Sequence, residues 1–252
     1  MRVIVPLTLL LTFAASCGDD EAPASPSPVT QPPPSNAVRV LMVTTTAGFR
    51  HDSIDTARVV VASIGSTTGE FRVTATEDLS TLTSSGLAAY DVLFFALTSG
   101  ELPLSAEQRA AILAFVAGGG GFLGAHSATD TLYGWPEYGE MVGAYFREHP
   151  WTQQGTVVVE DASHPAAAGV GSQFSINEEF YTFRENPRPR VQVLLRLDAA
   201  SVGSRGDYPL AWTRPHGRGR VYYNALGHFS STWQDPRFQR QLRGAITWAA
   251  GR

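Results

Sequence analysis

Three histidines stand where apolar runs of the sequence stop. His51 follows the run 38–46, His126 directly follows the letters GGFLGA, and His228 comes two residues after Leu226. Imidazoles exchange protons near pH 7 and bind divalent metals, so several in one site would suit acid/base or metal-assisted chemistry. One such histidine more often bonds to loop backbone, so a purely structural role is the alternative.

Carboxylates that could complement these imidazoles are few. The stretch INEEFYTF contains Glu178 and Glu179, and strand alternation would send these neighbours to opposite faces, so only one can enter a pocket. Asp52 and Asp130 each closely follow a candidate histidine, although capping of a loop or helix would explain them as well. Ser127 lacks the Gly-x-Ser-x-Gly pattern of a nucleophile elbow, which argues against a serine nucleophile.

The composition excludes several other chemistries. The chain has 252 residues and a net charge of -4, which gives no reason to expect a nucleic-acid partner. All 19 basic residues are arginine, so lysine Schiff bases and phosphate-loop lysines are excluded. The single cysteine, Cys17, precedes the expected domain, so a cysteine nucleophile is excluded there as well.

The first residues are typical of an exported bacterial protein. Residues 1–16 combine Arg2, an apolar run and small residues, which indicates a signal peptide. The ending FAASC resembles a lipobox, and this resemblance implies lipidation of Cys17 and anchoring in the cell envelope, at the outer membrane. An ordinary signal peptide with an incidental cysteine is the alternative. Residues 17–37 are rich in Pro and Ser and form a tether, so the membrane is contacted through the anchor only.

The elements that must position the histidines are predicted by hydrophobic patterning. The first half alternates apolar strands with helices at 53–64 and 104–119, the second of which Ser105 and Gln108 would cap. This order predicts an α/β fold with a doubly wound, mainly parallel sheet, in which Val38–Leu41, Val92–Leu97 and Phe122–Ala125 are adjacent strands. The expected strands are 38–46, 71–78, 90–98, 120–125, 155–161, 174–183, 191–197, 208–214 and 219–227, before a closing helix at 235–251.

Taken together, the motifs resemble those of the ThuA-like (trehalose utilisation) family across essentially all of 38–250. The matching stretches are GFRHDSI, GGGFLGAHSATDT, YGEMVGAYFREHPW, HPAAAG, NEEFYTF, PLAWTR, GRGRVYYNALGH and GAITWAA. The resemblance implies one domain over 38–252 with a flavodoxin-like sheet and additional strands, as in class I glutamine amidotransferases. It also implies that His126 occupies the sharp turn where amidotransferases carry their cysteine.

The resemblance implies carbohydrate catabolism as the function. The family is linked to trehalose and related disaccharides, alongside dehydrogenases that make 3-keto sugars. A 3-keto group acidifies the hydrogen on carbon 2, so a base can expel the anomeric substituent and water can add back. Such a step needs a base, an acid and a group that polarises the ketone, which a divalent metal could supply.

We therefore expect an enzyme with a small carbohydrate substrate, in which His126 and Glu179 form the acid/base pair. Glu179 is preferred because the family motif has its acid directly before FY. His51 and His228 would polarise the substrate, or bind a divalent metal together with His126. A non-catalytic, lipid-anchored carbohydrate-binding or scaffold protein is the alternative, and the oligomeric state stays open. The remaining substrate-binding candidates are Arg50, Asp130 and Tyr181, and the aromatic residues that could stack on sugar, or belong to core or rim, are Phe49, Tyr133, Trp135, Tyr181 and Trp233.

Overall fold

The computed structural model describes residues 36–252. The expected signal peptide, Cys17 and nearly all of the tether lie outside the described residues. Within the described part, the first strand begins at Val38, the residue at which the sequence predicted the domain to start. None of the helices in residues 36–252 combines the length and apolar character that crossing a membrane requires.

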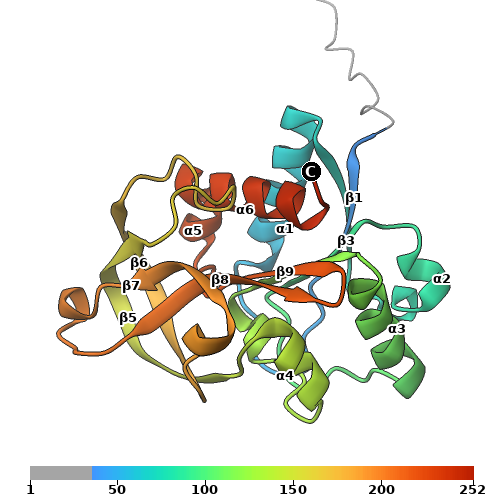
Figure 1. The fold of residues 1–252 in the computed structure, drawn as a ribbon, viewed down its shortest axis with the longest axis horizontal. Helices are drawn as coiled ribbons and strands as arrows, with labels where there is room; N and C mark the ends of the chain where they lie inside the picture. Colours follow the sequence, from blue (N-terminus) through green and yellow to red (C-terminus); the bar gives the residue numbers. More distant parts are fainter. Residues whose placement is uncertain (1–35) are drawn as a thin grey trace, which may run out of the picture. The chain divides into compact units, whose positions relative to one another are not determined.

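Five parallel strands form the first half of the sheet, in the order β2-β1-β3-β4-β9. All residues of β3 and β4 are buried, because helices cover both faces of this half. Figure 1 shows α1, α5 and α6 on one face, and α2, α3 and α4 on the other. The parallel strands are β1 Val38–Val43, β2 Phe71–Thr76, β3 Val92–Ala96, β4 Gly121–Ala125 and β9 Gly219–Asn224.

The three helices that the sequence predicted, at 53–64, 104–119 and 235–251, are present, whereas α4 and α5 were not predicted. Ser105 and Gln108 form the expected capping box at the start of α3. The α-helices are α1 Ile54–Thr68, α2 Ser84–Leu87, α3 Ala106–Ala117, α4 Pro136–Val142, α5 Ser230–Gln234 and α6 Pro236–Ala249. The short 3-10 turns are Leu79–Thr81, His126–Thr129, Arg188–Arg190 and Ala199–Val202.

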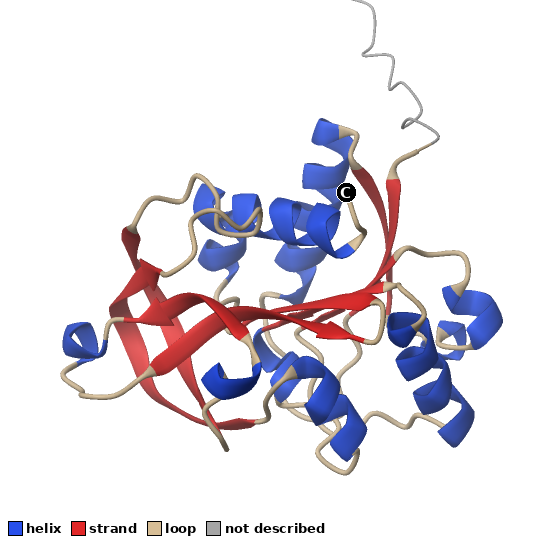
Figure 2. Cartoon of the chain, in the orientation of Figure 1, coloured by secondary structure: helices blue, strands red, loops and turns tan. Residues whose placement is uncertain are grey.

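Four further strands continue the sheet from β9 in the antiparallel order β8-β7-β5-β6 (Figure 2). The predicted doubly wound, parallel part is confirmed. Because the antiparallel extension contributes as many strand pairs as the parallel half, the doubly wound part accounts for only half of the sheet. β5 starts at Phe146, whereas the sequence predicted a start at 155. The first residues of this strand are exposed and interrupted by bulges, so they lack the alternating pattern by which a strand is recognised in a sequence. The strands are β5 Phe146–Val159, β6 Gln173–Phe183, β7 Gln192–Leu197 and β8 Tyr208–His216.

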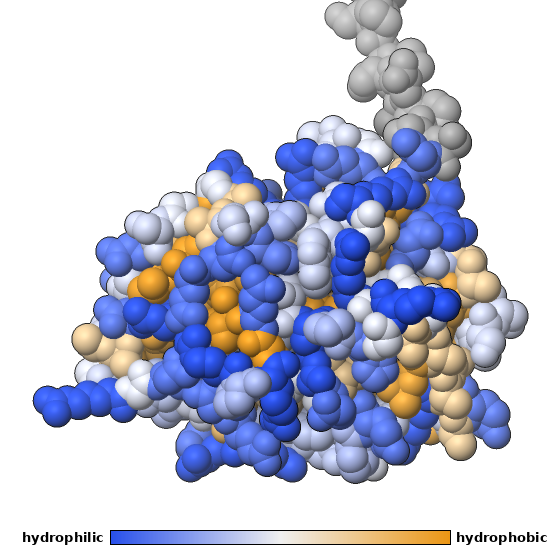
Figure 3. Space-filling model, viewed as in Figure 1, coloured by the Kyte–Doolittle hydropathy of each residue, from blue (hydrophilic) through white to orange (hydrophobic). Residues whose placement is uncertain are grey.

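The strand order creates a natural place for a site. The order reverses beside β1, which pairs with β2 on one side and β3 on the other, and such a point leaves a crevice at the carboxyl ends of the strands. The carboxyl ends of β1, β4 and β9 lead into the three loops that carry the candidate histidines. On the face shown in Figure 3, hydrophilic side chains cover most of the surface and apolar ones gather in separate patches.

Candidate functional site

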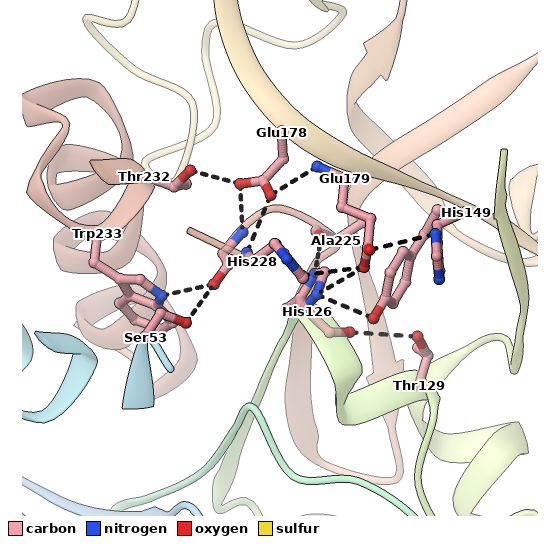
Figure 4. Close-up of polar contacts among 12 residues, drawn as sticks. Ser53, His126, Thr129, His149, Glu178, Glu179, Ala225, His228, Thr232 and Trp233 are labelled. Carbon is pink, nitrogen blue, oxygen red and sulfur yellow. Dashed lines mark hydrogen bonds and ion pairs between the residues drawn. The ribbon is translucent and has the colours of Figure 1, made fainter. Parts of the chain in front are cut away.

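The structure brings four of the predicted residues together. One ligand atom each from His51, His126, Glu179 and His228 lies within 4.8 Å of the others. The imidazole ring centres are 4.7 Å apart for His51 and His126, and 5.3 Å apart for His126 and His228. These side chains come from the loop after β1, the end of β4, strand β6 and the loop after β9, and Figure 4 shows the last three converging. We refer to the four as the histidine–glutamate cluster.

His126 forms the sharp turn that the family resemblance implies. Its φ of 51° lies in the left-handed region, which costs energy for a residue with a side chain and often marks a functional position. The ring is fully buried, and its Nδ1–H donates to the carbonyl oxygen of Ala225 at 2.8 Å. Because a carbonyl oxygen only accepts, Nδ1 carries a proton, and Nε2 is the ring atom left to meet other groups.

The Nε2 atom of His126 faces the other members of the cluster. It lies 3.0 Å from the hydroxyl of Tyr181 and 3.5 Å from Oε2 of Glu179. A metal on Nε2 would take the place of the Tyr181 bond and free that hydroxyl to donate to a bound molecule. The fixed Nδ1–H donor is the arrangement that commonly orients metal-binding histidines.

The two adjacent glutamates have different tasks, and both are buried. Oε2 of Glu179 lies 3.2 Å from Nδ1 of His228, so the preference for Glu179 as the member of the site agrees with the geometry. Glu178 accepts the N–H groups of Gly227 and His228 at 3.0 and 3.1 Å, and the hydroxyl of Thr232 at 2.6 Å. Glu178 therefore holds the loop that presents His228 (Figure 4).

The charges of the cluster are set by burial and by contact between its members. Burial, together with the neighbouring imidazoles of His126 and His228, lowers the pKa of His51 to about 3, so this ring is neutral. The contact with Glu179 raises the pKa of His228, against the opposing effect of burial. Burial disfavours ionisation of Glu179, but its contacts with His126 and His228 outweigh that effect and lower its pKa. The carboxylate is thus ionised and the His51 lone pair is available.

The donor set fits a divalent metal. Nδ1 of His51 is buried without a hydrogen-bond partner, which is rare for buried polar atoms, and Nδ1 of His228 has only the ion-pair contact with Glu179 at 3.2 Å. Three imidazoles and one carboxylate suit zinc, iron or manganese. Metal–nitrogen bonds of about 2.1 Å separate tetrahedral ligand atoms by about 3.4 Å, so a small inward movement would close the cluster on an ion. Among the described residues, these four fit the group: His51, His126, Glu179 and His228.

A cavity of about 240 Å³ opens beside the cluster. His126 does not line it and lies beneath, which suits a metal ligand better than a group that exchanges protons with substrate. A larger cavity of about 370 Å³ lies at Trp151 and Tyr208, but no histidine lines it. The residues around the smaller cavity are Phe49, His51, Asp130, Phe146, His149, Glu179, Tyr181 and His228.

Asp130 and Tyr181, which the sequence analysis named as substrate-binding candidates, both line the cavity. Oδ1 of Asp130 accepts the hydroxyl of Tyr133 at 2.6 Å, which places the predicted Tyr133 behind Asp130. Burial raises the pKa of Asp130, although the bond from Tyr133 and nearby imidazoles oppose this shift. A half-buried carboxylate with one oxygen fixed in this way is suited to accept a hydrogen bond from a hydroxyl group of a sugar.

Other candidates lie elsewhere. Arg50 does not line the cavity, because its guanidinium is paired with Glu77 at 2.9 Å. Trp135 and Trp233 are buried in the core and do not line it either. Ser127 is fully buried next to the turn, and its side chain does not reach the lining.

Two lining residues were not assigned by the sequence analysis. His149 and Phe146 both come from the irregular start of β5. Nδ1 of His149 lies 3.3 Å from Oε1 of Glu179, on the side away from the other histidines. The only signal in the sequence was that both residues fall inside the family-like stretch YGEMVGAYFREHPW.

The sequence and the fold both have known relatives. Residues 39–249 match the sequence model of the ThuA family, described as trehalose utilisation. A protein described as ThuA-like from Bacteroides uniformis is 22% identical, with a TM-score of 0.73 over 89% of this chain and 95% of that one. Another from Parabacteroides merdae is 19% identical, with a TM-score of 0.69 over 85% and 90%. A Thermoplasma acidophilum protein described as part of a GMP synthase is 11% identical, with a TM-score of 0.52 over 85% and 95%, and shows the fold alone. A search among curated proteins gives no match.

Proposed function

The chain belongs to the ThuA family, and we propose that it is an enzyme that cleaves disaccharides, or their 3-keto derivatives, at the histidine–glutamate cluster. The observation that carries this proposal is the convergence of four titratable side chains within 4.8 Å beside a cavity. A protein that only binds sugar needs hydrogen bonds and stacking, and has no need for three imidazoles around one carboxylate.

The reaction on a 3-keto glycoside balances without an external oxidant. A base removes the proton on carbon 2, and the C–H electron pair forms a double bond to carbon 1. The anomeric C–O bond breaks, its electron pair stays on the leaving oxygen, and that oxygen takes a proton from an acid. Water then adds across the double bond, so that glycoside and water give a 3-keto sugar and a free alcohol.

Proton transfer falls to the groups that line the cavity. Oε1 of Glu179 accepts the proton from carbon 2, and His149, which is half-exposed next to that oxygen, protonates the leaving group. Asp130 and Tyr181 orient the hydroxyl groups of the sugar. His51, His126 and His228, together with Glu179, would hold a divalent metal, and such an ion would supply polarisation of the ketone.

We also propose that the protein acts in the bacterial cell envelope. This rests on the lipobox-like FAASC and the Pro/Ser-rich residues that follow it. In this proposal Cys17 carries lipid, and the anchor is the sole contact with the membrane.

The test combines metal analysis with turnover. The purified protein is assayed for bound metal and incubated with 3-keto-trehalose before and after a chelator. We expect about one equivalent of metal, and a loss of turnover of about 100-fold or more on chelation that added metal reverses. The variant His126→Asn, which tolerates the left-handed turn, should lose both metal and turnover. His164→Asn is the matched control, because His164 is also buried but packs against Trp248 away from the cluster.

Two results would count against the proposal. Full turnover by metal-free protein would show that the cluster works without an ion. Sugar binding without turnover of any disaccharide, oxidised or not, would favour the non-catalytic carbohydrate-binding protein.

A further inference from the structure

Resting on the proposed function, we infer that the site accepts the terminal sugar ring of a glycoside end-on, while Phe49 forms a stacking platform for the group attached to that ring. The protein would then act on chain ends and tolerate different leaving groups. The size of the cavity, the exposure of Phe49 and the anchoring of its loop carry this inference.

The cavity has room for one ring. A hexose has twelve non-hydrogen atoms and occupies roughly the volume of six waters, or about 180 Å³. The cavity of about 240 Å³ therefore has room for at least one hexose. Its inner end is closed by buried side chains, since His126 is fully buried and Tyr181 nearly so. A sugar chain therefore cannot pass through, and only an end unit can reach Glu179.

Phe49 is an exception among the apolar residues of the described chain. Phe49 and Val59 are the large hydrophobic residues that remain exposed there, with 65% and 69% of their surface accessible. Phe49 lines the cavity, and its ring centre lies 4.8 Å from that of His51. An exposed aromatic ring at a cavity that also contains titratable side chains leaves apolar surface in water, which a sugar or aryl ring can cover.

The loop that carries Phe49 is anchored in spite of this exposure. The hydroxyl of Ser99 donates to the carbonyl oxygen of Phe49 at 2.5 Å. The N–H groups of Ala47 and Gly48 both donate to the carbonyl oxygen of Ser99, at 2.8 and 3.1 Å. Gly100, at a φ of 73°, packs so closely that a Cβ there would lie 2.5 Å from the nitrogen of Gly48. The backbone under the ring is thus fixed, which lowers the entropy cost of stacking.

His51 and Glu179 are far more buried than this platform, with 5% and 8% of their surface accessible against 65% for Phe49. Asp130, Glu179 and His149 line the cavity, whereas Phe49 and Phe146 supply its aromatic surfaces. Selectivity should therefore lie in the inner ring, which meets directional hydrogen bonds, and the outer group should be recognised by its flat apolar face alone.

The first experiment compares leaving groups across variants. The 3-keto derivatives of methyl glucoside, phenyl glucoside and trehalose are assayed with wild type, Phe49→Ala and Val59→Ala. In Phe49→Ala, the preference in KM for the phenyl and disaccharide substrates over the methyl substrate should fall about three- to tenfold. Val59→Ala removes an equally exposed apolar side chain on α1 and should leave the preference unchanged. Comparing ratios between variants cancels the intrinsic reactivity of each leaving group.

The second experiment needs no turnover. Metal-free protein is titrated by calorimetry with maltotriose, which has chain ends, and with a cyclodextrin, which has none. We expect heat of binding from the linear sugar only, and weaker binding of it by Phe49→Ala. Equal binding of the cyclic sugar, or an unchanged substrate preference in Phe49→Ala, would overturn the end-on inference while turnover itself still stood. Absence of turnover by metal-loaded wild type would overturn the proposed function instead.

Discussion

At the scale of single residues, the site is defined by how one carboxylate is shared. Oε2 of Glu179 faces His126 and His228, at 3.5 and 3.2 Å, and Oε1 faces His149 at 3.3 Å. Glu179 therefore contacts three imidazoles with a single carboxylate. Burial lowers the pKa of a further imidazole, that of His51, to about 3, so this ring is neutral and its lone pair is available. A carboxylate surrounded by imidazoles is a suitable place for a divalent cation.

The titration of His51 predicts how stability depends on pH. Its folded pKa lies below the unfolded value of 6.5, so unfolded chains bind the proton first, and stability is lost as the pH falls from 6.5 towards 3. For metal-free protein, we expect His51 to remove about 1.5 kcal/mol between pH 6.5 and 5. Denaturant unfolding at these two pH values measures this loss, and His51→Gln should abolish it. An identical loss in His51→Gln would mean that other groups cause it.

At the scale of elements, loops carry the chemistry and strands hold the loops. The loop after β9 is fixed by Glu178, whose carboxylate accepts from Gly227, His228 and Thr232. The loop after β1 is fixed by its contact with Ser99 and Gly100 after β3. Each of these two loops, which carry His228 and His51, is thus held by contacts with a segment distant in sequence. Such contacts give the rigidity that metal binding requires.

Removal of the Glu178 carboxylate should damage both stability and the site. Glu178→Ala removes the acceptor of four donors, the N–H groups of Glu179, Gly227 and His228 and the hydroxyl of Thr232, which should cost about 3 kcal/mol or more in the free energy of unfolding. It also loosens His228, so metal affinity should fall about 10- to 100-fold. Glu185→Ala, which breaks an exposed ion pair with Arg190 just after β6, is the control and should cost under about 0.5 kcal/mol. Unchanged metal affinity in Glu178→Ala would show that His228 does not depend on this support.

The contact between Gly48 and Gly100 should likewise contribute to both the stability of the fold and the affinity for metal. Gly100→Ala would place a Cβ 2.5 Å from the nitrogen of Gly48, whereas Gly203→Ala, at a similar φ of 69°, would meet nothing within 4 Å. The control should cost about 1 kcal/mol from backbone strain alone. Gly100→Ala should cost more and should weaken metal binding, because the loop with His51 must move. Denaturant midpoints and metal titrations distinguish the two, and equal values for both variants would contradict the prediction.

At the scale of the whole molecule, both halves of the sheet are needed to build one site. The parallel half brings the three histidines of the cluster through β1, β4 and β9. The antiparallel half brings Glu179 and Tyr181 on β6, and His149 on β5. Figure 2 shows these antiparallel strands gathered at one side of the parallel half. The carboxylate of Glu179 therefore depends on β6, which is an edge strand of the nine-stranded sheet.

The location of the protein is also a property of the whole chain. We expect Cys17, which lies outside the described residues, to carry lipid and to hold the domain in the membrane fraction. Mass spectrometry of the mature N-terminus and fractionation of cells test this, and Cys17→Ser should shift the protein to the soluble envelope fraction. An unmodified Cys17, or cleavage at another position, would refute the anchor.

The sequence by itself determined the parallel half and the identity of the cluster. Continuous apolar runs specify buried parallel strands, and the capping box at Ser105 specifies a helix start, because both are local patterns. Since the carboxyl ends of parallel strands share one edge, His51, His126 and His228 could be expected to meet. The choice of Glu179 rested on the family-like motif, and the geometry agrees with it.

Only the tertiary structure decided what each side chain meets across long distances in sequence. His149 lies in the exposed and bulged first part of β5, where the sequence has no regular alternation of apolar and polar residues. No local pattern therefore identifies His149 as a residue of the site. Glu178 stabilises a loop that is distant in sequence, because its carboxylate accepts the N–H group of Gly227, 49 residues away. Arg50 shares its loop with His51 yet turns to Glu77, because an opposite charge is within reach there. Local patterning fixes which face of an element is apolar, but the pairing of β5 with β6 and the packing of loops fix which polar groups become neighbours.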